Sequence, residues 1–213
     1  MIKIIIYFGI LAAAFVLSLF RIKKVTPSLR IISILLGFTL TVETVALWMN
    51  FHYHNNMLAY QVAGPVQLFV IALYYQETLP CLKKYKTAYW QGGLGIIAAL
   101  LNSRLQQHAD FLNADFLLFE GFCVVAMALY AFYFLILKDI SIPIFSLPLF
   151  WVSLIFLFFW CGTFIAWALF NILRILGQKE GLNKIYLGLW FINLACYVAL
   201  AILFFIKKPV AND

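Results

Sequence analysis

Long apolar runs recur along almost the whole chain, and they constrain its fold more than any other feature. Seven runs are present, at residues 4–20, 31–49, 57–75, 88–101, 116–137, 148–169 and 185–206. A helix needs about 20 apolar residues to cross the hydrocarbon core of a bilayer, and it satisfies its backbone hydrogen bonds internally. A transmembrane barrel would instead show short segments of alternating hydrophobicity. The sequence therefore predicts an all-α polytopic membrane protein, a seven-transmembrane-helix bundle that forms one integral membrane domain over residues 1–213.

Composition supports this prediction. Of 213 residues, 66% are hydrophobic and 11% are charged, a balance that polar surface on a soluble domain of this size could not cover. The net charge of +7 comes from short basic clusters between the apolar runs rather than from one amphipathic face. We therefore expect membrane lipids as partners and no nucleic acid.

The fourth run differs from the other six. Residues 88–101 form the shortest run, which includes the polar and flexible sequence Trp90-Gln91-Gly92-Gly93. A tilted or partly re-entrant segment could show the same pattern. Six spans plus a half-span is therefore the alternative to seven spans.

The basic residues predict an orientation, because cytoplasmic loops carry an excess of Lys and Arg. With the N-terminus outside and the C-terminus in the cytoplasm, ten of the 15 basic residues lie on the cytoplasmic side and five lie outside. The ten are Arg21, Lys23, Lys24, Arg30, Lys83, Lys84, Lys86, Lys138, Lys207 and Lys208. The opposite orientation would place this excess on the wrong side of the membrane.

Two acidic residues fall inside predicted spans, where an ionised group is costly unless it is paired or hydrated. Glu43 lies about two turns before the external end of the second span, and Glu120 lies about one turn into the fifth. Both belong to the outer half of the bilayer, and either carboxyl could be protonated and donate a hydrogen bond. One interpretation is that they recognise a charge or a proton. The other is that each bonds a Tyr, Gln or Asn across a helix interface.

Other polar residues extend the predicted outward-facing pocket around these acids: Gln61, Gln67, Asn193 and Tyr197. Gly64-Pro65 would bend the third span beside them, either to shape the pocket or only to pack. Trp160 lies near the middle of the sixth span, where its indole either packs or lines the pocket.

All three histidines are predicted to lie outside. His52 and His54 follow the second span, and His108 lies near Asp110 after the fourth. Imidazole and carboxylate groups suit a transition metal, but an H-x-H pair in a loop is weak evidence for one. We therefore expect no metal site and no cofactor, with these four residues as weak candidates. Sensing of pH by the histidines is a further alternative.

Several membrane chemistries lack their required residues. The seventh span has lysines only at its ends, so a retinal Schiff base is excluded. There is no ladder of arginines for voltage sensing and no G-x-S-x-G nucleophile with an intramembrane His. The sequence therefore offers no catalytic set and favours a non-enzymatic protein.

Four segments carry a resemblance to a known group: Val42-Glu43-Thr44, Leu118-Phe119-Glu120, the stretch 148–153, and Asn193. On these residues the chain resembles the uncharacterised small seven-transmembrane-helix proteins that are common in Bacteroidetes. The resemblance implies a multi-pass protein of the bacterial inner (cytoplasmic) membrane, and it brings no function with it. The chain departs from the group at Gln67, where the resemblance implies another carboxylate.

The interpretation we favour is a receptor-like or sensory protein whose outer pocket binds a small ligand, a lipid headgroup or a proton. Its loops are short, so we expect it to signal through a membrane-protein partner, and an oligomer is possible. A proton- or cation-coupled transporter or channel is the first alternative. The second is an accessory subunit of a two-component sensor, an envelope machine or a phage-defence module. A metal-dependent intramembrane hydrolase that uses Glu43 and the loop histidines is the least favoured.

Overall fold

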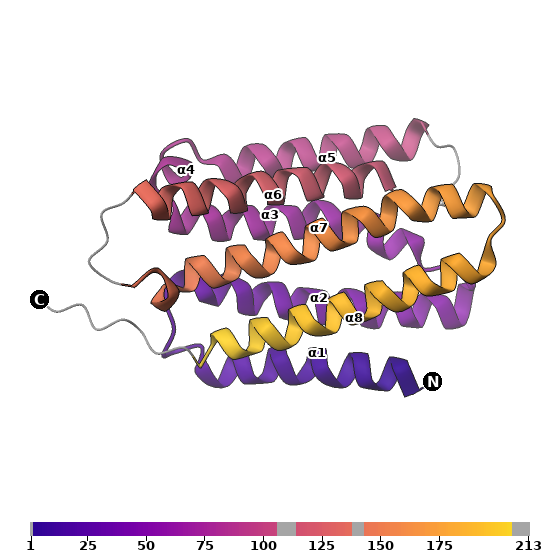
Figure 1. Cartoon of the computed structure of the whole chain (residues 1–213), viewed down its shortest axis with the longest axis horizontal. Coiled ribbons are helices and arrows are strands. Elements are labelled where there is room, and N and C mark those ends of the chain that lie inside the picture. The colour runs from indigo at the N-terminus through magenta and orange to yellow at the C-terminus, as the bar shows by residue number, and fades with distance from the viewer. Residues whose placement is uncertain (1, 106–113, 138–142, 206–213) are drawn as a thin grey trace, which may run out of the picture.

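A computed structural model describes residues 2–105, 114–137 and 143–205 of the chain (Figure 1). The described part contains eight α-helices, one 3-10 helix and no strand, which confirms the all-α prediction. The elements in chain order are α1 (Ile2–Arg21), α2 (Pro27–Tyr53), α3 (Met57–Thr78), α4 (Pro80–Lys84), α5 (Thr87–Leu105), α6 (Ala114–Leu137), η1 (Ile144–Ser146), α7 (Pro148–Ile175) and α8 (Lys179–Leu203).

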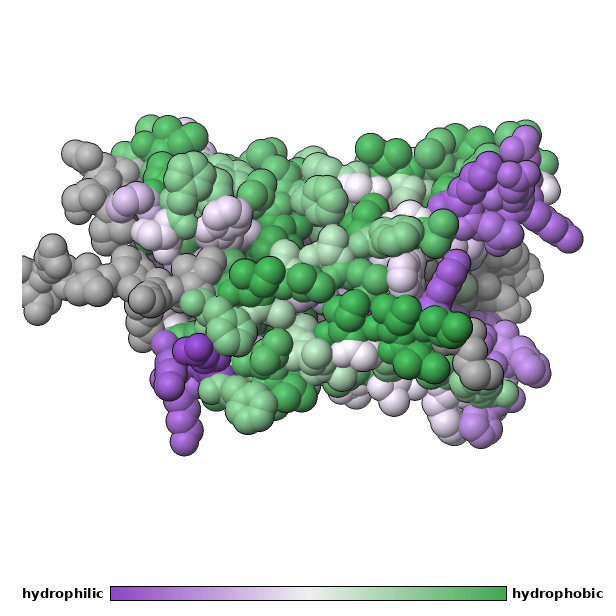
Figure 2. Space-filling view, turned by 60° about the horizontal axis from the view of Figure 1, so that its bottom comes forward, coloured by the Kyte–Doolittle hydropathy of each residue, from purple (hydrophilic) through white to green (hydrophobic). Residues whose placement is uncertain are grey.

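Six of the described helices are long and apolar enough to cross a membrane, namely α1, α2, α3, α6, α7 and α8. Helix α5 carries a shorter apolar stretch, Thr87–Leu101. On the face shown in Figure 2, hydrophobic residues cover the middle of the molecule and hydrophilic residues gather at its two ends. This distribution is the one that a bilayer requires of a spanning bundle.

The ends of α2 illustrate how the sequence sets helix boundaries. Thr26 caps the first turn, where its side chain accepts the N–H of Leu29 at 3.5 Å, and Pro27 occupies the first helical position. At the other end His54 adopts a left-handed conformation, and its backbone N–H donates to the carbonyl of Asn50 at 3.1 Å.

Among the predicted spans, the last one, 185–206, differs most from the helix observed there. Helix α8 begins at Lys179, and it ends at Leu203. Its first turns are polar and include an ion pair of 2.7 Å between Lys184 and Glu180. Apolar runs report only the part of a helix that lies in lipid, so they miss polar turns that continue beyond it.

Six helices form a closed ring in the order α1, α2, α3, α6, α7, α8, and each contacts the next. Helices α8 and α1 close this ring. The indole of Trp190 donates to the carbonyl of Lys3 near one end, and the guanidinium of Arg21 lies 4.8 Å from the ring centre of Phe205 near the other. Helix α5 lies outside the ring, against α3 and α6.

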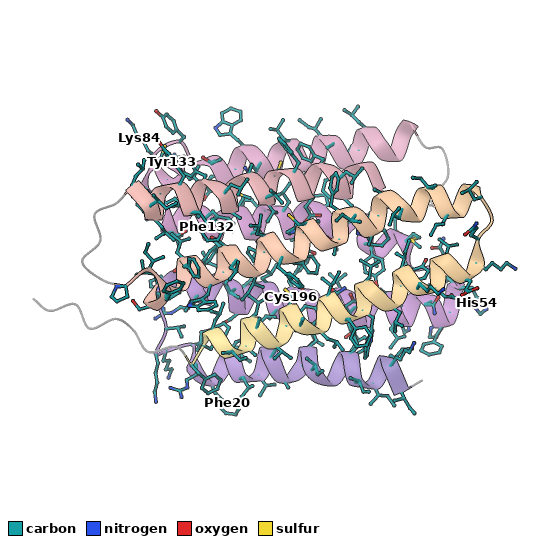
Figure 3. All side chains as sticks on the ribbon, viewed as in Figure 1. Phe20, His54, Lys84, Phe132, Tyr133 and Cys196 are labelled. Carbon is teal, nitrogen blue, oxygen red and sulfur yellow. The ribbon has the colours of Figure 1, made fainter. Side chains whose placement is uncertain are left out.

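The buried hydrophobic core fills the interior of the ring over about one half of its length along the helix axes. It contains residues from the middle of α1, the first half of α2, the second half of α3, the middle of α6, the first half of α7 and the end of α8. Figure 3 shows Phe20 and Lys84 at this end of the bundle and His54 at the opposite end. Within the core, Tyr75 donates to the hydroxyl of Ser153 at 3.3 Å. The interior of the ring is therefore closely packed with apolar side chains at one end, and polar groups lie in the other half.

Glycines bring α5 close to α3. A Cβ on Gly92 would lie 2.7 Å from the ring of Phe69, and one on Gly95 would lie 3.3 Å from Leu68. A Cβ on Gly93, by contrast, would meet nothing within 4 Å. Small residues at helix interfaces allow such close approach in membrane proteins.

This geometry gives a first prediction. We expect Gly92→Leu to destabilise the protein by about 1–3 kcal/mol, because the new side chain overlaps Phe69. Gly93→Leu is the matched control and should unfold at the temperature of the parent or above it. Thermal unfolding of the full-length protein in detergent measures both variants, and equal unfolding temperatures would contradict the α3–α5 packing.

Candidate functional site

A cavity of about 470 Å³ lies inside the ring, and each of the six ring helices contributes to its lining. It extends from Asn56 at the α2–α3 turn to Leu35, Ile71 and Leu200, which border the core. None of the described residues that line it belongs to α5. The ring helices therefore enclose the cavity, which lies towards the end where α1 begins.

Six of the seven residues that the sequence analysis assigned to a pocket line this one cavity: Glu43, Gln67, Glu120, Trp160, Asn193 and Tyr197. The seventh, Gln61, lies on the same helix as Gln67 but does not line the cavity. Cys196, which Figure 3 shows near the middle of the bundle, also lines it.

The weak metal candidates do not form a site in the described part of the chain. His52 and His54 are exposed at the end of α2, and the ring of His52 stacks on Trp48 with centroids 4.7 Å apart. His108 and Asp110 lie outside the described residues. Among the residues that the structure describes, no group of three or more His, Cys, Asp or Glu could hold a metal ion.

The Gly64-Pro65 pair lies inside α3, which continues from Met57 to Thr78 without a break. Gly64 lines the cavity, and a Cβ at this position would lie 2.5 Å from the ring of Phe116 on α6. The glycine therefore allows the Phe116 ring to pack closely against α3 beside the cavity.

Glu43 is bonded to tyrosines of two neighbouring helices. Tyr7 on α1 donates to Oε1 at 2.9 Å, and Tyr60 on α3 donates to Oε2 at 3.0 Å. Each carboxyl oxygen therefore accepts one phenol, which is the partnering that a buried acid needs. This is the second interpretation raised from the sequence, an acid bonded to a tyrosine across a helix interface.

The same network continues onto α8. The hydroxyls of Tyr7 and Tyr197 lie 3.0 Å apart, and Tyr197 is the donor between them because Tyr7 gives its single proton to Glu43. Oδ1 of Asn193 lies 3.3 Å from the Tyr197 hydroxyl and is the alternative acceptor for that proton. The amide of Asn193 in turn donates to the carbonyl of Leu189 at 2.8 Å. A continuous chain of hydrogen bonds thus joins α3, α2, α1 and α8 around one side of the cavity.

Sequence reasoning missed Tyr7 and Tyr60. Both lie within apolar runs, where a tyrosine is usually read as packing or as an interfacial anchor. The sequence did hold a signal, since a hydroxyl buried in a span needs a polar partner and Glu43 is an acid within a neighbouring predicted span.

Glu120 is bonded differently. It is 1% exposed, and its Oε1 has no hydrogen-bond partner among the described residues. The next residue on α6 is Gly121, where a Cβ would lie 3.1 Å from the indole of Trp160, so α6 and α7 approach closely at this point. The part of the chain that the structure describes thus leaves this buried oxygen of Glu120 without a partner, and such groups carry a free-energy cost.

The rest of the lining is largely apolar, and its α7 side is aromatic. The aromatic side chains on α7 that face the cavity are Phe156, Phe159, Trp160 and Trp167. Among the described residues of the lining there are two carboxyls and neither a Lys nor an Arg. The electrostatic character of the cavity is therefore set by acids and aromatic faces, a combination that favours cations over anions.

Comparison with known protein families, with curated proteins and with solved structures finds no match for this chain. The interpretation of the cavity therefore depends on its geometry alone.

The network around Glu43 gives a second prediction. We expect Tyr60→Phe to lower the free energy of unfolding by about 1–3 kcal/mol, because it leaves Oε2 of Glu43 without its donor. Tyr89→Phe is the matched control, since Tyr89 is 60% exposed. Thermal unfolding in detergent compares them, and equal losses would show that the phenol of Tyr60 contributes no special stability.

Proposed function

We propose that the chain is a receptor-like membrane protein that binds a small ligand in the cavity inside its helix ring. The observation that carries the proposal is a cavity of about 470 Å³ in which an unsatisfied carboxyl, Glu120, meets aromatic walls. Sites for small molecules are typically concave, mostly apolar, and equipped with a few polar groups that fix orientation. The cavity has each of these properties.

We further propose that the chain crosses the inner membrane of a bacterium seven times, with its N-terminus outside. Helix α5 supports the seventh crossing because it returns the chain from the end of α3 to the end where α6 begins (Figure 1). The 19 residues of α5 extend about 28 Å, close to the thickness of the hydrocarbon core. The resemblance to small seven-helix proteins of Bacteroidetes agrees with this membrane.

The orientation has its own support. Seven described basic residues lie at the end where α1 and α3 finish: Arg21, Lys23, Lys24, Arg30, Lys83, Lys84 and Lys86. An excess of this kind marks the cytoplasmic side. The cavity lies towards the other end, and it therefore faces outward.

Topology can be tested by cysteine labelling, which is the third prediction. In a background without the native cysteines, Lys184→Cys should react with a membrane-impermeant maleimide added to intact spheroplasts. Lys23→Cys should react only after the membrane is permeabilised, because it lies at the opposite end of the bundle. The reverse pattern would invert the proposed orientation.

The packed half of the ring favours a receptor, which binds its ligand without transporting it across the membrane. Below the cavity the core closes the interior with side chains such as Leu11, Ile32 and Tyr74, each no more than 1% exposed. A continuous aqueous path is therefore blocked, and output passes through helix contacts with a membrane-protein partner. The described loops are short, so the helices themselves supply the surface for such a partner.

A transporter is the second candidate, favoured by the two carboxyls that line a cavity closed at one end. An outward-facing carrier has this form before it changes conformation. Proteoliposomes separate the two functions, since carboxylate-dependent proton or cation flux above that of empty liposomes would replace the receptor with the carrier.

The fourth prediction tests the cavity itself. Val42 lines it, whereas Val45 lies on the same helix and is 45% exposed. We expect Val42→Phe to fill part of the cavity and to abolish any ligand-dependent rise in unfolding temperature. Val45→Phe should retain it. A screen of ammonium, carboxylate and neutral compounds supplies the ligands, and a site occupied at 100 times Kd stabilises by about 2.7 kcal/mol.

If no compound stabilises the parent protein, or if Val42→Phe and Val45→Phe respond alike, the cavity is not a ligand site. The receptor proposal then fails, whatever the topology experiment shows.

A further inference from the structure

We propose that the ligand is a small organic ammonium compound, a primary or secondary amine in its protonated form attached to an apolar or aromatic body. This inference deepens the proposed function and depends on it. Three properties of the cavity support it: the bonding of its two acids, the absence of basic residues from its described lining, and its aromatic walls.

The bonding of Glu120 identifies the polar end of the ligand. Its side chain is almost completely buried, and Oε1 has no partner among the described residues although the residue lines the cavity. An acceptor of this kind is satisfied by an N–H or O–H donor that enters the cavity. A charged N–H donor makes the stronger bond and also compensates the carboxylate. Glu120 is therefore the group that receives the ligand.

Glu43 has a different part, because its two oxygens already accept the phenols of Tyr7 and Tyr60. Both oxygens of Glu43 therefore have donors within the protein. Direct bonding to the ligand belongs to Glu120, and Glu43 adds a second acidic side chain to the lining.

The charge balance excludes anionic ligands. No Lys or Arg is present among the described residues that line the cavity, so a carboxylate or a phosphate would enter beside two acids with no counter-charge. A cation would instead enter beside two acids that can act as counter-charges. The lining therefore favours positively charged ligands, whatever their shape.

The aromatic walls select the rest of the ligand. Indole and phenyl faces attract cations, and they also bury apolar groups. Phe156 and Trp160 are 3% and 4% exposed, so the wall that they form is fixed by packing. A volume of about 470 Å³ suits a compound of drug-like size or smaller.

An N–H donor distinguishes amines from quaternary ammonium compounds. A quaternary nitrogen would keep the attraction to the aromatic faces but would leave Oε1 of Glu120 unsatisfied. Amines are therefore expected to bind more tightly than their quaternary analogues, which makes the assignment of Glu120 testable with the parent protein alone.

The same chemistry could come from a free amine or from the ethanolamine headgroup of a phospholipid. A phospholipid also carries a phosphate, for which the described lining provides no basic residue. Unfolding temperatures in phosphatidylcholine nanodiscs with and without phosphatidylethanolamine show whether the lipid is the source.

The experiment uses the purified full-length protein and three matched probes: phenethylammonium, its N,N,N-trimethyl analogue and neutral 2-phenylethanol. Calorimetric titration gives Kd, and ligand-dependent unfolding temperatures check it. We expect phenethylammonium to bind best, with the alcohol weaker by about 30-fold or more because it brings no charge to Glu120. The quaternary analogue should lie between them.

Two variants carry the same substitution at different places. Glu120→Gln should weaken phenethylammonium by about 30-fold or more and leave the alcohol unchanged. Glu77→Gln is the control, since Glu77 pairs with Lys83 at 3.0 Å at the other end of the bundle, and it should bind all three probes like the parent. If Glu120→Gln does not fold, the three probes on the parent protein still decide the question.

The outcomes separate this inference from the proposed function. Equal affinity for the amine and the alcohol, or for the amine and the quaternary analogue, overturns the ammonium assignment. If the probes bind with equal affinity and Val42→Phe abolishes their binding, the cavity remains a ligand site, but for a class of ligand other than ammonium compounds. If none of the three probes binds, the ammonium assignment fails, and the ligand screen with Val42→Phe and Val45→Phe decides the proposed function separately.

Discussion

The constraint on which the rest of the structure depends is that a polar group within a bilayer must find its partner inside the protein. The backbone satisfies this constraint by forming helices throughout the spans. The side chains meet it by turning inward, and for this reason Glu43, Tyr7, Tyr60 and Tyr197 meet within one hydrogen-bonded network. A ring of helices around a polar interior follows from this requirement, with lipid-facing surfaces left to Leu, Ile, Val and Phe.

The ring divides lengthwise into two halves with different tasks. Hydrophobic side chains and the bond between Tyr75 and Ser153 fill one half, which gives the bundle a fixed base. The other half holds the cavity, and stability there depends on hydrogen bonds between helices rather than on dense packing. The two halves therefore depend on different interactions, and local opening need not have the same free energy in both.

The two acids differ in how their carboxyl groups are hydrogen-bonded. Two phenols satisfy Glu43, so that the protein alone accounts for its presence in a span. Oε1 of Glu120 has no donor among the described residues, and the cost of burying it is not met within the described structure. Buried polar atoms without partners are rare in folded proteins, and they concentrate where a ligand, a proton or strain has a function. Ser33, Tyr74 and Gln91 also have a buried polar atom without a partner among the described residues, but Glu120 is the acid of this group and lines the cavity.

The sequence alone determined the helical class and the approximate positions of the six long apolar helices, and it located two acids within them, because apolar length and the cost of intramembrane charge act locally along the chain. It could not give the order of helices in the ring, the position of α5 outside it, or the bonds from Tyr7 and Tyr60 to Glu43. These depend on which faces of distant helices meet, and helix faces that are apolar nearly all round carry little record of their neighbours. Gln61 and Gln67 show the limit most clearly: both are amides within one predicted span, and only the position and rotation of α3 in the folded bundle placed Gln67 in the lining of the cavity and left Gln61 out of it.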